Sequence, residues 1–167
     1  MNEQSTVRVI RVLLVDDEAT LLEYLSKRLL RQGHTVKATF SGEDAVEAAK
    51  QEHFDVAVVD LKMPGIDGVE TQKRLREIQP FLQCIILTGH GSIESALESG
   101  HEDAFQYLLK PVDYDNLVAV IKEAYEKKMK LQEAKFQEQL EELHHHGMGA
   151  RGMKNAIAEL RKIYGFE

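Results

Sequence analysis

The sequence predicts an α/β domain built on a five-stranded parallel sheet. Short apolar runs alternate along the chain with segments of helical periodicity, which is the pattern of repeated strand–helix units. Three of these runs end in charged side chains, at Asp16, Asp60 and Lys110. Because open α/β sheets gather ligands at the carboxyl ends of their strands, we expect these charges to share one crevice.

The predicted elements follow one another in regular order. Strands are expected at residues 8–15, 35–39, 56–59, 84–87 and 105–109. Helices are expected at residues 19–31, after Ser41, at 69–78, at 93–99 and after Pro111. Gly33 should end the first helix, and Ser41 and Asp113 are the expected caps of the second and last helices.

Beyond the core the chain changes character, because Lys, Glu and Gln become frequent. The segments expected are a tail at 1–6, the domain at 7–127, a charged helical extension at 128–146, a Gly-rich linker at 147–152 and a short amphipathic helix at 153–167. Met129, Phe136 and Leu143 are seven apart, so a paired coiled coil and a solvated helix both remain open. The last helix is too short to persist alone, and it could dimerise, dock a partner or fold back on the domain.

Composition excludes several classes of protein. The 167 residues carry a net charge of −7, which argues against direct binding of nucleic acid or of an anionic membrane. No apolar stretch approaches the roughly 20 residues of a membrane helix, and no export segment begins the sequence. The single cysteine, Cys84, lies in an apolar run and is expected in the core. A cytoplasmic protein is therefore expected, and it is expected to stand alone because the residues after the domain are too few for an output domain.

The charged crevice has a chemical meaning. Asp16, Asp17 and Asp60 would repel one another at close range, so a hard divalent cation such as Mg²⁺ is the natural way to hold them together. Lys110 would add an anchor for phosphate. Each residue alone could be an ordinary cap, turn or surface residue, but their shared position at strand ends favours a functional site.

The ordered motifs resemble a known family. Asp16-Asp17, Asp60 with Met63-Pro64-Gly65 and Asp67-Gly68, Thr88, Tyr107 and Lys110-Pro111 occur in the order found in the receiver domain of bacterial two-component response regulators. The resemblance covers about residues 7–127 and implies the flavodoxin-like, doubly wound (βα)5 fold of CheY-like receivers, with the last helix extended beyond the domain.

The resemblance also implies a chemistry. Asp60 would accept a phosphoryl group from a histidine kinase or phosphotransfer protein, with Mg²⁺ as the cofactor. Asp17 and Asp60 would bind the metal directly, Asp16 through water, and the backbone carbonyl of Lys62 would complete the protein ligands. No enzymatic activity is implied beyond self-catalysed phosphorylation and autodephosphorylation.

The resemblance also implies a conformational switch and a protein partner that responds to it. Lys110 and Thr88 would contact the phosphoryl oxygens, and movement of Thr88 would let Tyr107 rotate inward. By resemblance the Lys110-Pro111 bond is cis, and the altered surface would bind a downstream protein. A homodimer through the C-terminal helix is possible. Two other classes remain: an aspartyl phosphatase, disfavoured because Lys62 stands where that chemistry needs a second acid, and an interaction or dimerisation module that takes no phosphate.

Overall fold

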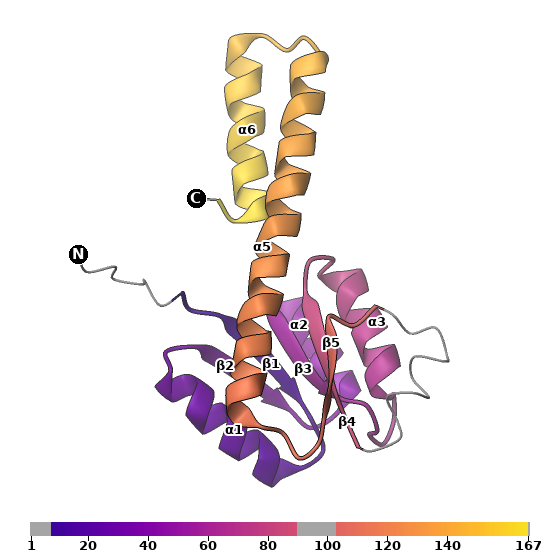
Figure 1. Cartoon of the computed structure of the whole chain (residues 1–167). Coiled ribbons are helices and arrows are strands. Elements are labelled where there is room, and N and C mark those ends of the chain that lie inside the picture. The colour runs from indigo at the N-terminus through magenta and orange to yellow at the C-terminus, as the bar shows by residue number, and fades with distance from the viewer. Residues whose placement is uncertain (1–7, 90–102, 167) are drawn as a thin grey trace, which may run out of the picture. The chain divides into compact units, whose positions relative to one another are not determined.

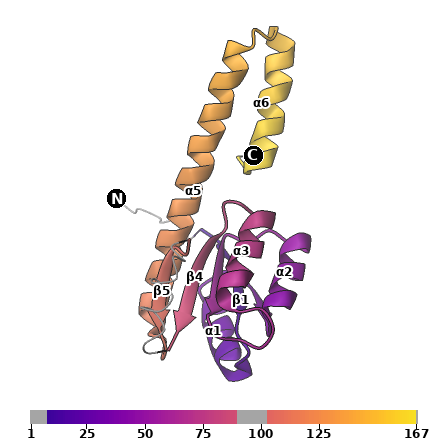
Figure 2. The ribbon, with the colours of Figure 1, turned by 90° about the vertical axis from the view of Figure 1, so that its right-hand side faces the viewer.

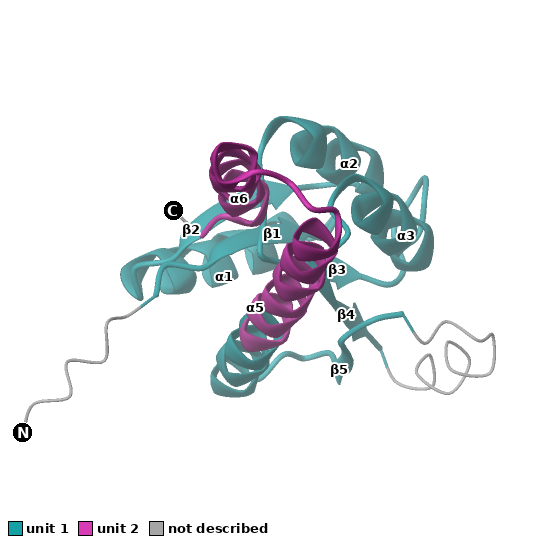
Figure 3. Ribbon diagram, turned by 90° about the horizontal axis from the view of Figure 1, so that it is seen from above, with its two compact units in different colours: residues 1–125 teal, residues 126–167 magenta. Residues whose placement is uncertain are grey.

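The computed structural model describes residues 8–89 and 103–166, and the chain divides into two compact units (Figures 1 and 3). The first unit, Met1–Tyr125, contains the α/β domain, and the second, Glu126–Glu167, contains a pair of helices. The helix expected at 93–99 lies outside the described residues. Within the described residues, no helix is both long enough and apolar enough to cross a membrane.

The sheet has five parallel strands, as predicted, and their order is β2-β1-β3-β4-β5. The strands are β1 (Arg11–Val15), β2 (Thr35–Thr39), β3 (Val56–Asp60), β4 (Gln83–Thr88) and β5 (Gln106–Leu109). β1 begins later than the expected residue 8, because the ladder with β2 starts at the pair Arg11 and Thr35. Along the other edge, Asp60 pairs with Leu87, and Thr88 pairs with Leu109. The strands therefore end level with one another.

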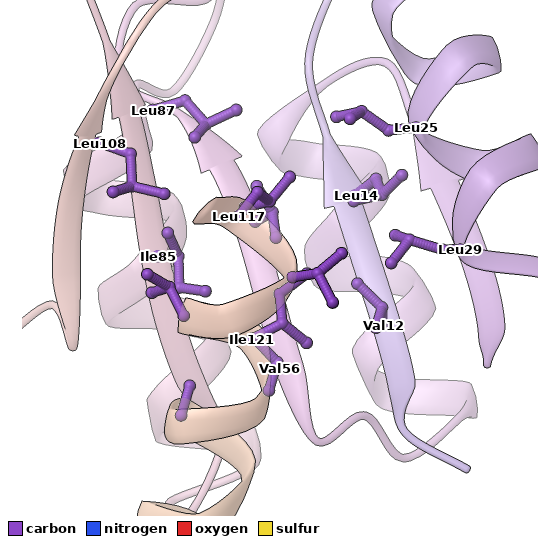
Figure 4. Packing of buried hydrophobic residues seen from close by; sticks show 14 of the residues in the cluster. Val12, Leu14, Leu25, Leu29, Val56, Ile85, Leu87, Leu108, Leu117 and Ile121 are labelled. Atoms are coloured by element: carbon purple, nitrogen blue, oxygen red, sulfur yellow. The ribbon is translucent and has the colours of Figure 1, made fainter. Parts of the chain in front are cut away.

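Alternation along the strands creates two separate hydrophobic cores. On one face Val12, Val58 and Ile85 pack with residues of α1 (Ala19–Arg31) and α5 (Tyr114–His145), as Figure 4 shows for part of this cluster. On the other face Val59 and Ile86 pack with residues of α2 (Gly42–Gln51) and α3 (Gly68–Ile78). Since both faces are covered, the central strands are apolar and buried from Val56 to Val59 in β3 and from Cys84 to Leu87 in β4. Cys84 belongs to the second core as predicted, and burial raises the pKa of its thiol to about 12.

Two helices start at the expected capping side chains, and a third starts at a cap that was not predicted. The Ser41 hydroxyl accepts a hydrogen bond of 3.1 Å from the backbone N–H of Asp44 and so caps α2. Asp113 accepts one of 3.1 Å from the N–H of Asp115 at the start of α5. The N-cap of α3 is Asp67, which accepts from the N–H of Glu70 at 2.8 Å.

The second unit is a helical hairpin formed by the extension of α5 and by α6 (Ala150–Tyr164), which run side by side in Figures 1 and 2. The α6 helix starts before the expected residue 153, because Gly149 provides the N-cap and Gly152 lies inside the helix. The ring centroid of Phe136 lies 6.1 Å from that of Tyr164 and 5.1 Å from that of Phe166. The middle residue of the possible coiled-coil seam, Phe136, is therefore buried by the same chain.

A Schellman motif fixes the end of this hairpin. Gly165 adopts a left-handed φ of 70°, its N–H donates to the Lys162 carbonyl, and the Phe166 N–H donates to the Arg161 carbonyl at 2.9 Å. The turn reverses the chain after α6 and lets Phe166 pack against Phe136. The sequence left open where the last helix docks, and the structure places it on α5.

Gln79 should be one of the main polar supports of the domain. Its buried side chain accepts from the Phe54 N–H at 2.9 Å and donates to the carbonyls of Ala49 and Glu52 at 2.8 and 2.7 Å. We expect Gln79→Ala to lower the free energy of unfolding by about 2–4 kcal/mol, measured by urea titration, because buried partners lose their hydrogen bonds. Gln51→Ala is the control, since Gln51 only reaches Glu47 on the surface. Equal effects of the two substitutions would contradict this role.

His34 should make stability depend on pH. Its buried ring accepts a 3.2 Å hydrogen bond at Nδ1 from the Ile10 N–H, and burial, assisted by the charge of Lys122, lowers its pKa from 6.5. The unfolded chain therefore takes up a proton on this histidine more readily than the folded chain does. The stability that neutral His34 contributes is present above about pH 6.5 and is lost as pH falls, by at most about 1.4 kcal/mol per pH unit.

His34→Asn provides the control for this pH dependence, because an asparagine oxygen can accept the same bond without titrating. Urea titrations of both proteins between about pH 5 and 7.5 should show the steeper loss in the wild type. If the free energy of unfolding fell with pH equally in both proteins, His34 would not be the cause of the pH dependence.

Candidate functional site

Four of the expected site residues meet at the carboxyl edge of the sheet. Asp60 and Thr88 are the last residues of β3 and β4. Asp16 and Lys110 directly follow β1 and β5, and the N–H of Lys110 donates to the Thr88 carbonyl at 2.7 Å. The strand pairing thus brings residues distant in sequence into one site.

Three carboxylates form the floor of this site. Asp16, Asp17 and Asp60 each offer an oxygen, and these oxygens lie within 4.8 Å of one another. Asp16 and Asp60 are buried and Asp17 is exposed. Three carboxylates at this spacing suit a hard divalent cation that prefers oxygen ligands, and the open side at Asp17 leaves room for water in its shell.

Lys110 is the cation that the structure places among these acids. Its Nζ lies 2.7 Å from Asp16 Oδ2, 3.4 Å from Asp60 Oδ1 and 3.7 Å from Glu18 Oε1. Burial alone would lower the pKa of Lys110, but the bond to Asp16 and the charges of Asp60 and Glu18 raise it, so the ammonium stays charged. The Lys110-Pro111 peptide bond is cis, as expected.

The pKa of Asp60 is raised, so its negative charge is only partly compensated by the groups around it. Burial, followed by the neighbouring charge of Asp16, raises the pKa of Asp60, and Lys110 only partly opposes the shift. Both carboxylate oxygens of Asp16 already accept hydrogen bonds: Oδ2 accepts from Lys110, and Oδ1 accepts a 2.8 Å bond from the Glu18 N–H. A cation beside Asp60 would therefore relieve repulsion that one lysine does not cancel.

The loop after Asp60 is held tightly. Gly68 N–H donates to the Leu61 carbonyl, and Leu61 N–H donates to the Leu87 carbonyl, both at 2.8 Å. Glu43 from α2 accepts a 3.0 Å bond from the Ile66 N–H, and Gly65 takes a φ of 80° beside that carboxylate. Lys62 lies in this loop, and the metal contact expected of its carbonyl stays a prediction.

Thr88 and Tyr107 occupy different surroundings. Thr88 is buried, and its hydroxyl donates to the Gly89 carbonyl at 3.4 Å, a long contact and the one bond it makes among the described residues. Tyr107 is partly buried against the core shared by α2 and α3, and burial, assisted by Asp103, raises the pKa of its phenol. Their coupled movement stays a prediction.

Sequence reasoning missed two acidic residues of the site. Glu18 is the N-cap residue of α1, yet its side chain makes no capping bond and instead approaches Lys110. Its place directly after Asp16-Asp17 could have revealed it. Glu43 holds the loop from another helix, and nothing in the local pattern around it indicates that contact.

Comparison with known proteins identifies the family. The sequence pattern described as "Response regulator receiver domain" matches residues 12–122. The chain belongs to the response regulator receiver domain family. The resemblance drawn from the motifs and the predicted flavodoxin-like fold are thereby confirmed, and with them the role of a receiver of the two-component type.

Curated relatives of this receiver are larger proteins. Transcriptional regulatory protein GlrR of Escherichia coli K12 is 37% identical over 115 residues, which are 69% of this chain and 26% of GlrR. The DNA-binding transcriptional regulator NtrC of the same organism is 34% identical over 113 residues, 68% of this chain and 24% of NtrC. The chain thus spans about a quarter of the length of these relatives.

Several solved structures resemble the receiver over nearly their whole length. A structure described as adenylate cyclase from Rhodopirellula baltica has a TM-score of 0.72 and 30% identity, covering 77% of this chain and 96% of its own. The response regulator TrrA of Thermotoga maritima, solved with Mg²⁺ and BeF, has a TM-score of 0.62 and 29% identity, covering 70% and 99%.

Proposed function

We propose that this receiver accepts a phosphoryl group on Asp60 from a histidine kinase or phosphotransfer protein, with Mg²⁺ bound beside it. The observation that carries the proposal is the arrangement around Asp60: carboxylate oxygens of Asp16 and Asp17 lie within 4.8 Å, and Lys110 Nζ lies 3.4 Å from Oδ1. Phosphoryl transfer needs chiefly positioning and charge neutralisation, and these groups supply both.

The hydrogen bonds of Asp16 support one assignment of the metal ligands. Asp17 and Asp60 would bind Mg²⁺ directly, and the Lys62 carbonyl would join them. Both oxygens of Asp16 already accept hydrogen bonds, from Lys110 and from the Glu18 N–H, which supports an outer role through water. Mg²⁺, when bound, would neutralise charge on Asp60 and on the phosphoryl oxygens.

The chain's own groups would carry the transfer. A carboxylate oxygen of Asp60 attacks the phosphorus of a phosphohistidine, the new O–P bond forms as the N–P bond breaks, and the electron pair remains on the imidazole nitrogen. Lys110 then contacts the phosphoryl oxygens instead of Asp60 Oδ1. Thr88 can donate its hydroxyl to them, because its present contact with Gly89 is only 3.4 Å long.

The output would be a change of surface. Thr88 moving toward the phosphoryl group would make space for Tyr107, which is already partly buried. The new surface would recruit a downstream protein partner. The protein would act in the cytoplasm without contacting nucleic acid itself, and its catalysis would be limited to its own phosphorylation and dephosphorylation.

Intact mass spectrometry tests the proposal directly. The full chain is incubated with a small phosphodonor and Mg²⁺, beside Asp60→Asn and a sample with chelator. One added phosphoryl group is expected only in the wild type with metal. Absence of labelling under conditions that label another receiver would overturn the proposal and favour a module that works without phosphate.

A further inference from the structure

The loop between β3 and α3 extends beyond the hydrogen bond that closes it. Gly68 N–H donates to the Leu61 carbonyl at 2.8 Å and so joins the two ends of the loop. Residues 62–67 lie outside this closure and are mostly exposed, although Met63 packs partly against the core shared by α2 and α3. Lys62 is among the exposed residues. Its carbonyl therefore needs further support if it is to keep one position.

The turn inside this loop does not close on itself. Pro64 followed by Gly65 with a φ of 80° is typical of a type II turn, in which the fourth N–H often donates to the first carbonyl. The fourth residue is Ile66, and its N–H donates instead to Glu43 Oε1 at 3.0 Å. Among the described residues, no hydrogen bond joins the Ile66 N–H to the Met63 carbonyl. The acceptor that closes the turn is thus supplied by α2.

The start of α2 contacts the same turn at two further points. The Glu43 carboxylate lies against Gly65, since a Cβ added to this glycine would lie 2.5 Å from Oε1. One residue earlier, a Cβ added at Gly42 would lie 2.5 Å from Ile66 Cγ1. The helices α2 and α3 lie side by side on one face of the sheet (Figures 2 and 3). The first turn of α2 therefore supports the loop through its backbone and through one side chain.

The Glu43 carboxylate is charged and is used by this contact. The bond from the Ile66 N–H, followed by one from its own backbone N–H, lowers the pKa of Glu43. Arg74 of α3, whose charge also lowers this pKa, forms its ion pair with Glu70 at 2.7 Å. Among the described residues Glu43 forms no ion pair, so its polar partners are backbone N–H groups.

We propose that Glu43 is a positioning residue of the metal site, because it closes the turn after Lys62 and so fixes where the Lys62 carbonyl lies. This inference rests on the Mg²⁺ site proposed above. Asp60 is held by its strand, whereas Lys62 directly precedes the turn, so an open turn would let its carbonyl move away from the carboxylates. A ligand that is already in place loses less conformational freedom when a cation binds.

A simpler role for Glu43 has to be separated from this one. Glu43 lies in the first turn of α2, where a carboxylate also interacts favourably with the helix dipole. Asp44 is the matched control, since it shares that turn, is exposed and, within the described part of the chain, forms no ion pair or side-chain hydrogen bond. Glu43→Gln separates the accepted bond from the charge, because a glutamine oxygen can accept from the same N–H.

Hydrogen exchange in the full chain without metal tests the contact itself. Exchange of the Ile66 amide, followed by NMR, should accelerate at least about tenfold in Glu43→Ala, because that amide loses a charged acceptor. It should change less than about threefold in Glu43→Gln and in Asp44→Ala. Circular dichroism checks that the three variants keep their fold. An Ile66 amide that exchanges at the wild-type rate in Glu43→Ala would overturn the inference.

Calorimetric titration with Mg²⁺ tests the consequence for the site. The dissociation constant should rise about tenfold in Glu43→Ala, the lower end of the losses seen when a group that orients a metal ligand is removed. Glu43→Gln should restore most of the affinity. In the mass assay, Glu43→Ala should need more Mg²⁺ for half-maximal labelling of Asp60 but approach the wild-type rate at saturation, because Lys110 is unchanged.

The outcomes distinguish this inference from the proposed function. Unchanged Mg²⁺ affinity in Glu43→Ala, an equal loss in Asp44→Ala, or no recovery in Glu43→Gln would overturn the inference, even if Asp60 is labelled normally. A wild type whose Mg²⁺ affinity depends on Glu43 but that is never labelled would overturn the proposed function and support the inference. A wild type that binds no Mg²⁺ would overturn both.

Discussion

Replacing Lys110 with alanine should slow phosphorylation of Asp60 at least about a hundredfold, because a buried site loses a donor aimed at developing charge. Lys110 is the lysine that contacts both Asp16 and Asp60, at 2.7 and 3.4 Å. The rate is measured as the time course of the mass increase with a small phosphodonor and Mg²⁺. Lys37→Ala is the control, since Lys37 is a surface residue paired with Glu52.

Binding of Mg²⁺ shows whether a slowly phosphorylated Lys110→Ala variant is still folded. With the ammonium gone, the carboxylates of Asp16, Asp17 and Asp60 should attract a divalent cation more strongly, so Lys110→Ala should bind Mg²⁺ more tightly in calorimetric titration. A folded variant that binds Mg²⁺ more tightly and is labelled as fast as the wild type would show that Lys110 does not assist the transfer.

Gly68→Ala should be among the most destabilising small substitutions in the domain. A Cβ added at Gly68 would lie 2.5 Å from the Asp60 carbonyl oxygen and 2.8 Å from the Leu61 Cα, and neither backbone atom can turn aside. We expect the free energy of unfolding to fall by about 2–4 kcal/mol, as in overpacked sites that must shift backbone. Urea titration followed by circular dichroism measures it.

The control for this prediction is Gly89→Ala, at another loop beside the site. A Cβ on Gly89 would meet no atom of the described residues within 4 Å, so the change should stay within about 0.5 kcal/mol. If Gly68→Ala were as mild as Gly89→Ala, the loop after β3 would be looser than its contacts indicate. The substitution should also displace Asp60 and slow its labelling.

The sheet and the site edge could be predicted because their signals are local. The interiors of the strands β3 and β4, which are buried on both faces, are apolar, and the residue that ends each strand is placed by the parallel register. The contact of Glu43 with Ile66 could not be predicted, because it joins a helix to a loop far along the chain. The docking of α6 was equally hidden, since an amphipathic pattern shows that a face is buried and does not show against what.

Two further expectations about the site are tested neither by the sequence nor by the fold. The Lys62 carbonyl and the paired movement of Thr88 and Tyr107 depend on bound metal and phosphate, and they stay predictions. Asp16 shows the limit clearly. The sequence placed it beside Asp17, but only the structure shows that both of its oxygens are already in use, by Lys110 and the Glu18 N–H.

The alternation of the strands between two cores restricts how the length of this chain can change during evolution. Deleting one residue inside β3 would exchange the side chains that face α5 with those that face α3, and both cores would be disrupted together. Length changes at the carboxyl edge would disturb the site. Insertions should therefore accumulate in the turns at the opposite edge, except in the turn between α2 and β3, which Gln79 holds through Glu52 and Phe54.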